Sequence, residues 1–165
     1  MFRCGEYVMY STHGACQIVA VEQRKIDRKS LEYYVLTPVN QPKSMFYVPT
    51  GNAVALSKLR AMLTLEDIHN LLQRHKNESA TWNPDESKRK NLYKELLGSG
   101  DTDALFSMIA SVTEHRKQME SVGKRIHSCD ETFLSEAKQL MNSEFSLVLK
   151  IPPQEVEAYI ENALI

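Results

Sequence analysis

The sequence predicts an α+β protein in which a small antiparallel β-barrel precedes an all-α helical bundle. Up to about residue 62, short segments rich in β-branched and aromatic residues alternate with turn-forming residues, a pattern typical of short antiparallel strands. From about residue 64, apolar residues recur at helical spacing instead. We therefore expect a barrel at residues 1–62, a linking helix and linker at 63–81, and a helical domain at 82–165.

Five short strands are expected in the barrel. The first two enclose a corner at Gly14, where glycine accepts a positive φ without a steric penalty. Because side chains alternate along a strand, Met45 and Tyr47 are expected to face away from Phe46, which we assign to the core. Barrels of this size resemble SH3 and Tudor modules, which bind partners more often than they catalyse reactions. The strands are expected at residues 7–10, 16–21, 33–37, 45–48 and 56–61, with a polar hairpin connection at 24–32.

Five helices are expected in the remainder of the chain, and each has a start signal in the sequence. The first is expected to end in a polar linker at residues 75–80, and the second is expected to place Leu92, Leu96 and Leu97 on its apolar side. The start signals are, in order, a Thr64–Asp67 capping box, Asn83 as a cap before Pro84, Asp101 as a cap, a Ser128–Glu131 capping box, and the Pro152–Pro153 break before the last helix.

The distribution of charge limits how this chain can bind nucleic acid. Its 165 residues carry a net charge of −1. Residues 1–82 contain 10 basic and 7 acidic side chains, whereas residues 83–165 contain 10 basic and 14 acidic side chains. A helical half with a charge of −4 does not hold DNA tightly by counterion release alone. Any DNA contact is therefore expected to be local, or to be delivered by another protein.

Several classes of protein lack their sequence signals here. No apolar run approaches the roughly 18 residues that span a membrane, and the first residues contain no signal-peptide core, so we expect a cytoplasmic protein. The three cysteines form no C-x-x-C pair, which favours reduced thiols over a metal site. The sequence also has no P-loop, no paired H-x-x-x-H histidines and no G-x-S-x-G elbow. We therefore expect no enzymatic activity, no metal and no cofactor.

Two spaced sets of residues form patterns that extend beyond single elements. The first set lies in the predicted barrel and is Phe2, Gly5, Glu6, Val8, Tyr10, His13, Gly14, Ile18, 33–36, Val48 and Pro49; the second, looser set is Trp82, Asn91, Leu92, Leu96, Ser99, Gly100, Asp101, Ala104 and Arg116. The first set resembles the N-terminal module of the CarD/CdnL family of bacterial RNA polymerase-binding transcription regulators, a module that also occurs in the transcription-repair coupling factor. The second set resembles the helical half of the same family, in which a single tryptophan precedes an Asn-Leu and a Ser-Gly-Asp.

The resemblance implies a polymerase-binding surface on the barrel. In the family, a basic residue at the end of the second strand and a residue just before the Val-Pro contact the polymerase β subunit; these positions are Arg24 and Tyr47 here. Met45 flanks Tyr47 and Lys25 follows Arg24, so we include both. Without the resemblance, the basic residues Arg24 and Lys25 indicate a solvated loop that discourages edge-to-edge pairing.

The resemblance also implies a DNA contact by Trp82. In the family, this tryptophan wedges into the minor groove at the upstream edge of the melted promoter, and nearby basic residues contact phosphates; Lys88, Arg89 and Lys90 are the nearby basic residues here. The alternative from the residues alone is a core tryptophan beside a solvated basic helix face.

Together these features predict a regulator that binds the RNA polymerase β subunit through its barrel and stabilises the open promoter complex through its helical domain. The alternative is an adaptor that binds polymerase or another protein without contacting DNA. A hydrolase has no constellation of residues to support it.

Overall fold

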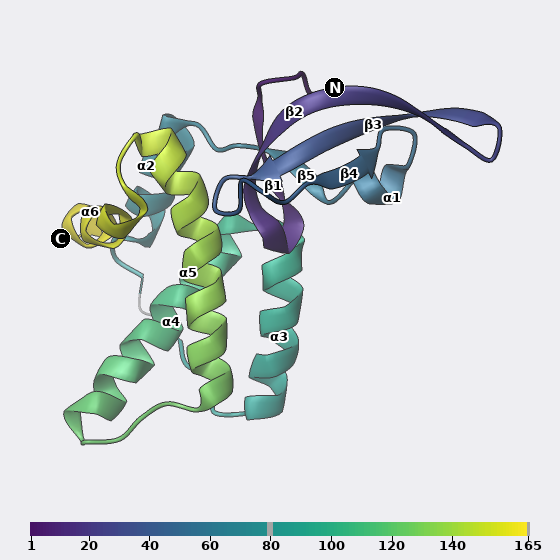
Figure 1. The fold of residues 1–165 in the computed structure, drawn as a ribbon. Helices are drawn as coiled ribbons and strands as arrows, with labels where there is room; N and C mark the ends of the chain where they lie inside the picture. The colour runs from purple at the N-terminus through teal and green to yellow at the C-terminus, as the bar shows by residue number, and fades with distance from the viewer. Residues whose placement is uncertain (79–80, 165) are drawn as a thin grey trace. The chain divides into compact units, whose positions relative to one another are not determined.

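The computed structural model describes residues 1–78 and 81–164 and confirms the α+β class. The chain divides into two compact units, Met1–Met62 and Leu63–Ile165. All five β-strands found among the described residues lie in the first unit, together with a short helix α1 (Ala53–Leu56). The second unit contains the five longer helices (Figure 1). Residues Ser79 and Ala80 of the predicted polar linker lie outside the described residues.

The first unit is a five-stranded antiparallel sheet with the strand order β4-β3-β2-β1-β5. Strands β4 and β5 therefore form its two edges. The side chains on its inner face enclose a core that includes Val8, Ile18, Leu36 and Val48, and Phe46 packs against this core as predicted. The strands are β1 (Tyr7–Tyr10), β2 (Gly14–Ile26), β3 (Lys29–Pro38), β4 (Phe46–Pro49) and β5 (Leu59–Ala61).

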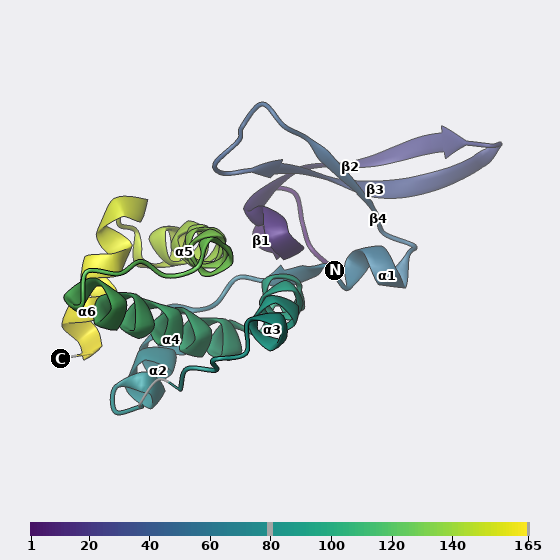
Figure 2. The ribbon, with the colours of Figure 1, turned by 90° about the horizontal axis from the view of Figure 1, so that it is seen from below.

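Strands β2 and β3 are longer than the sequence indicated. The predicted hairpin connection at residues 24–32 is wrong, because most of these residues pair across the two strands, Arg24 with Leu31 among them. Only Asp27 and Arg28 form the turn, with φ of 48° and 63°. Both faces of this two-stranded ribbon are exposed (Figure 2). Its side chains are therefore mostly polar and lack the apolar alternation that reveals a half-buried strand.

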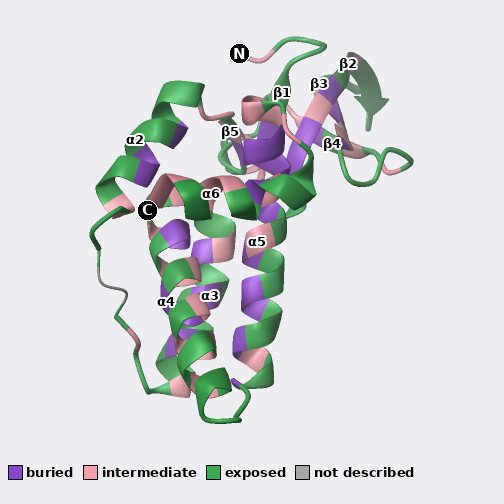
Figure 3. Cartoon of the chain, turned by 90° about the vertical axis from the view of Figure 1, so that its left-hand side faces the viewer, coloured by how far each residue is buried: buried purple, intermediate pink, exposed green. Residues whose placement is uncertain are grey.

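The second unit is a helical bundle whose three longest helices pack against one another: α3 (Glu86–Ser99), α4 (Thr102–Ser121) and α5 (Ser128–Leu149). Helix α2 (Leu65–His75) contacts α5 and the last helix, α6 (Val156–Leu164). Both α2 and α6 lie at the end of the bundle opposite the loop between α4 and α5 (Figure 1). Figure 3 shows the buried positions of α5 as a stripe along the helix, which is the pattern of an amphipathic helix.

The helix starts agree with the sequence prediction at two of the four caps. Thr64 and Asp67 form the predicted capping box, and the Asp101 side chain caps α4. Asn83 does not cap α3: Asp85 does, by accepting a hydrogen bond from the Lys88 backbone N–H at 3.1 Å. The Ser128–Glu131 box is also wrong, because α5 begins after His127 with no side-chain cap.

The inward face of α3 agrees with the prediction at Leu96 and Leu97, which pack in the core, and differs from it at Leu92. Leu92 is 38% exposed, whereas Arg89, Tyr93 and Leu96 are buried. Burial at these three positions follows helical spacing but includes a charged residue, which a search for apolar residues passes over. The core between α3, α4 and α5 contains Tyr93, Leu96, Leu105, Val112, Phe133, Leu134 and Ala137, with Trp82 packed against its side.

Candidate functional sites

Arg24 and Tyr47 form one contact on the surface of the first unit. The guanidinium carbon of Arg24 lies 3.8 Å from the centre of the Tyr47 ring. A cation placed over an aromatic face is attracted to it and is thereby oriented. The Tyr47 hydroxyl points to the Met45 sulfur at 3.9 Å. Met45 is 58% exposed and Tyr47 is 40% exposed, so three of the four residues predicted to bind polymerase are gathered on one patch.

Strand register explains why Arg24 reaches Tyr47. Tyr47 on β4 lies opposite Val35 on β3, and Arg24 on β2 lies opposite Leu31 on β3. Leu31 and Val35 are four residues apart, so they project from the same face of the strand. The long arginine side chain can therefore extend along this face to the tyrosine.

Two charged residues near Arg24 in the sequence, Glu22 and Lys25, lie differently relative to its side chain. Glu22 accepts hydrogen bonds from the Arg24 guanidinium at 3.3 Å. Both side chains are more than 40% exposed, and an ion pair this exposed adds little stability but limits where the guanidinium points. Lys25 is the next residue along β2 and is exposed. Because neighbouring residues on a strand face opposite sides, Lys25 lies on the other face from Arg24.

Trp82 lies between two other side chains in the second unit. The ring of His115 stacks on it at 3.8 Å with an interplanar angle of 9°. The guanidinium carbon of Arg89 lies 4.3 Å from the centre of the Trp82 ring. Trp82 remains partly exposed. It is therefore fixed in orientation without being removed from the surface.

Arg89 is held by a buried network. Its guanidinium donates hydrogen bonds to both carboxylate oxygens of Asp130, at 3.0 and 2.9 Å, and a third to the Asn83 carbonyl at 2.9 Å. The Tyr93 hydroxyl donates to Asp130 at 2.6 Å. Burial alone would raise the pKa of Asp130, but the bonds from Arg89 and Tyr93 outweigh it and hold that pKa below its ordinary value.

The three predicted phosphate contacts differ in availability. Arg89 is 3% exposed and already paired with Asp130, so its guanidinium is not available to a phosphate and instead packs against Trp82. Lys88 and Lys90 are exposed. Each is near a carboxylate of the same helix end, Lys88 with Asp85 at 3.7 Å and Lys90 with Glu86 at 2.6 Å. These surface pairs are weak enough to exchange for a phosphate.

Comparison with known families adds one finding to this geometry. Residues 2–60 match the family model of the CarD-like/TRCF RID domain. The match confirms the resemblance seen in the sequence over the first unit, and residues 2–60 are called the CarD-like domain below. The match supports the interpretation that this is a transcription-related protein that interacts with RNA polymerase. Arg24, Met45 and Tyr47 all lie within the matched residues.

Outside the CarD-like domain, the sequence prediction missed the residues that hold Trp82. His115 is 33 positions further along the chain in the sequence and gave no signal. Asp130, in contrast, could have been found from the sequence. It precedes the core residues Phe133 and Leu134 by one helical turn and therefore lies on the apolar face of α5. A carboxylate at a core position calls for a buried cation, and Arg89 is that cation.

The described part of the chain lacks two other kinds of feature. Within residues 1–78 and 81–164, no set of three or more His, Cys, Asp or Glu side chains is arranged to hold a metal ion. None of the helices in the same ranges has the length and apolar character that crossing a membrane requires.

Proposed function

We propose that this protein is a transcription regulator that binds the β subunit of RNA polymerase through Arg24, Met45 and Tyr47. The observation that carries the proposal is the Arg24–Tyr47 contact, at 3.8 Å, on an exposed face of the CarD-like domain. A guanidinium held over a tyrosine offers a charge-assisted bond to a carboxylate. The tyrosine ring and the methionine beside it offer apolar area with few rotatable bonds in the ring.

The edge position of β4 supports the same surface. β4 is hydrogen-bonded to β3 on one side and forms one edge of the sheet. An edge strand presents unpaired backbone groups to which a partner strand can add. Met45 and Tyr47 flank this edge and are exposed, so backbone pairing and side-chain contacts would be made by one partner segment.

The second half of the proposal assigns Trp82 to promoter DNA. An aromatic side chain inserted into the minor groove partly unstacks a base step, at a cost of about a few kcal/mol per step. A ring already fixed between Arg89 and His115 loses little conformational entropy on insertion. Lys88 and Lys90 are exposed on the first turns of α3 and would position the phosphate backbone.

Tethering makes a weak DNA contact sufficient. A chain docked on polymerase holds its second unit near the promoter at a high effective concentration, so the acidic character of residues 83–165 does not prevent contact. Binding the open promoter complex better than the closed one shifts the population towards the open complex. This mechanism requires no catalysis and no cofactor, and it implies a cytoplasmic protein.

Binding to purified RNA polymerase and to its isolated β subunit tests the proposal. Arg24→Glu and Tyr47→Ala are expected to weaken binding at least about ten-fold, since a residue central to an interface contributes about 1.4 kcal/mol or more. Tyr7→Ala is the matched control, because Tyr7 is 43% exposed on β1, two strands away from β3. An equal loss of affinity in all three variants, or no binding by the native protein, would overturn the proposed polymerase-binding surface.

The proposed DNA contact is tested separately, by the lifetime of the open promoter complex. Trp82→Ala is expected to shorten the lifetime of the open complex while leaving polymerase binding unchanged. Loss of both together would mean that Trp82 acts only through the stability of the second unit, and an unchanged lifetime would favour the adaptor function without DNA contact.

A further inference from the structure

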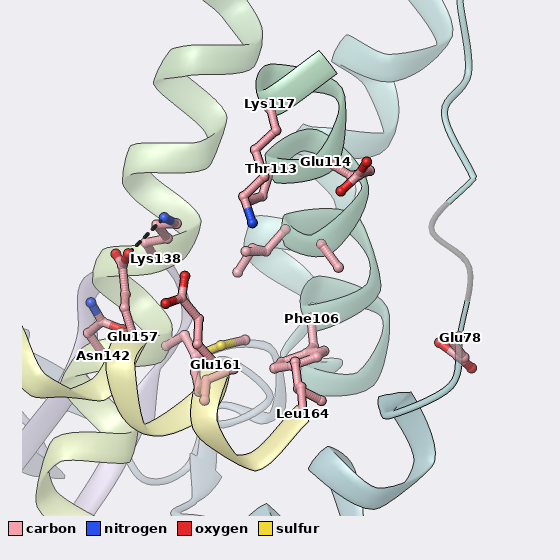
Figure 4. Close-up of a pocket in the computed structure, with 14 residues that line it drawn as sticks. Glu78, Phe106, Thr113, Glu114, Lys117, Lys138, Asn142, Glu157, Glu161 and Leu164 are labelled. Carbon is pink, nitrogen blue, oxygen red and sulfur yellow. Dashed lines mark hydrogen bonds and ion pairs between the residues drawn. The ribbon is translucent and has the colours of Figure 1, made fainter. Parts of the chain in front are cut away.

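A groove in the second unit lies outside both candidate sites. It has a volume of about 530 Å³ and runs between α4, α5 and α6 (Figure 4). Its floor is apolar and is formed by Phe106, Ile109, Met141, Ile160 and Leu164. Concave, mostly apolar sites of this size are typical of ligand-binding sites.

The length of the groove fits a helix. Along α4 it is lined by Phe106, Ile109, Ala110, Thr113 and Lys117, which lie on one face of the helix at spacings of three and four residues. At 1.5 Å per residue, this stripe is about 16 Å long, or roughly three helical turns. A partner helix laid along it would contact the stripe over its whole length.

The charged side chains around the groove indicate which charge a bound ligand would carry. The lining residues include four carboxylates and two ammonium groups, and Lys138 is already paired with Glu157 at 3.0 Å. Glu161 makes no hydrogen bond or ion pair with another residue in the described part of the chain. Figure 4 shows the Glu161 carboxylate directed into the space between α6 and α4. Of the other three carboxylates, Glu78 is paired with His75, and Glu114 accepts a hydrogen bond from the neutral amide of Gln118 at 3.3 Å. Glu114 and Glu161 therefore leave the groove acidic against the single remaining ammonium, that of Lys117.

We propose that this groove binds an amphipathic helix of a partner protein, with large apolar side chains on one face and lysine or arginine on its flanks. The apolar face would cover the floor of the groove, as in other helix-in-groove complexes. The basic flanks would pair with Glu114 and Glu161 at its rim. This inference does not depend on polymerase binding by the CarD-like domain, since every residue that lines the groove lies in the second unit.

A labelled peptide tests the proposal on the full chain. The probe has about 14 residues, enough for nearly four helical turns, with leucine at i, i+3, i+4, i+7, i+8 and i+11 and lysine elsewhere. Saturable binding is expected by fluorescence anisotropy. A second peptide with glutamate in place of every lysine is expected to bind at least about ten-fold more weakly. No binding of the lysine peptide, or equal binding of the two peptides, would overturn the proposal.

Two pairs of variants locate the binding site. Ala110→Trp fills the groove from an exposed position on α4 and is expected to abolish binding, whereas Asn162→Trp, at an exposed position of α6 outside the groove lining, is not. Glu161→Lys is expected to weaken binding by about five-fold or more, and Glu136→Lys on the exposed side of α5 is its matched control. Circular dichroism melting confirms that each variant is folded. Native-like binding by both folded groove variants would contradict the assignment.

Discussion

Arg89 and Asp130, 41 residues apart in the sequence, form a buried bidentate ion pair with N–O distances of 3.0 and 2.9 Å. The pair joins the first turns of α3 and α5. Because Arg89 also lies under Trp82, the pair determines where the only tryptophan of the chain is held. Its loss would therefore affect both the stability of the second unit and the candidate DNA contact.

Removal of one partner from this ion pair is expected to be strongly destabilising. Asp130→Ala leaves a buried guanidinium without its counter-charge, which typically costs about 3–5 kcal/mol. Lys90→Ala, which breaks the exposed pair with Glu86 on the same helix, is expected to change stability by less than about 1 kcal/mol. Urea unfolding followed by circular dichroism measures both. Similar effects for the two variants would show that the buried pair adds nothing beyond a surface one.

Acid is expected to destabilise the second unit through Asp130. Its pKa in the folded protein lies below the ordinary value of 3.8, so its contribution to stability is complete above that value and is lost as the pH falls through the lower folded pKa. The unfolding free energy should therefore decline below about pH 3.8. Asp130→Asn should flatten this part of the profile, and an unchanged slope in that variant would assign the acid sensitivity to other carboxylates.

Trp82 fluorescence is expected to report the protonation of His115. Burial lowers the pKa of His115 below 6.5 and outweighs the negative charge of Asp130, which raises it; the positive charge of Arg89 lowers the pKa further. Neutral His115 is favoured in the folded state, so its contribution to stability is present above pH 6.5 and is lost as the pH falls through the folded pKa. Because the two rings stack, protonation should quench the indole with a midpoint below 6.5. His115→Gln should abolish the transition; a midpoint at or above 6.5 would be inconsistent with this burial.

The periodicity of apolar residues in the sequence predicted most of the helices and strands, and it failed where an element has no buried apolar face. The helices of the second unit were predicted because Leu105, Val112, Phe133 and Ala137 recur at helical spacing and are buried as expected. The tips of β2 and β3 were missed because they have two exposed faces and so no apolar alternation. Asp27 and Arg28 also lack the glycine that usually reveals a two-residue hairpin turn.

For the candidate sites, the sequence predicted which residues take part but not the contacts that they make. The positions of Arg24 and Tyr47 followed from the family pattern, yet their contact depends on the pairing of β2, β3 and β4, which no local sequence feature specifies. Arg89 was assigned to DNA because it lies within a basic triplet. The structure turns it inward because it is one helical turn before Tyr93, on the buried face of α3.

The β2–β3 turn offers a stabilising substitution. Arg28 has a φ of 63°, a conformation that glycine adopts without the steric penalty of a side chain. Arg28→Gly is expected to stabilise the first unit by about 0.5–1 kcal/mol, because both central residues of this turn have positive φ. Thermal unfolding of the variant measures the change. Arg28→Ala keeps the strained backbone and is expected to give no gain, so equal stabilisation by alanine would point to removal of charge instead.

Site-specific crosslinking to RNA polymerase tests the central claim most directly. A photoreactive phenylalanine analogue at Met45, which is 58% exposed beside Tyr47, would be activated in the presence of the core enzyme, with the same analogue at Tyr7 as the control. We predict a crosslink from position 45 to the β subunit that Arg24→Glu removes, and none from position 7. A crosslink from position 45 to another subunit, or equal crosslinking to β from both positions, would contradict the account.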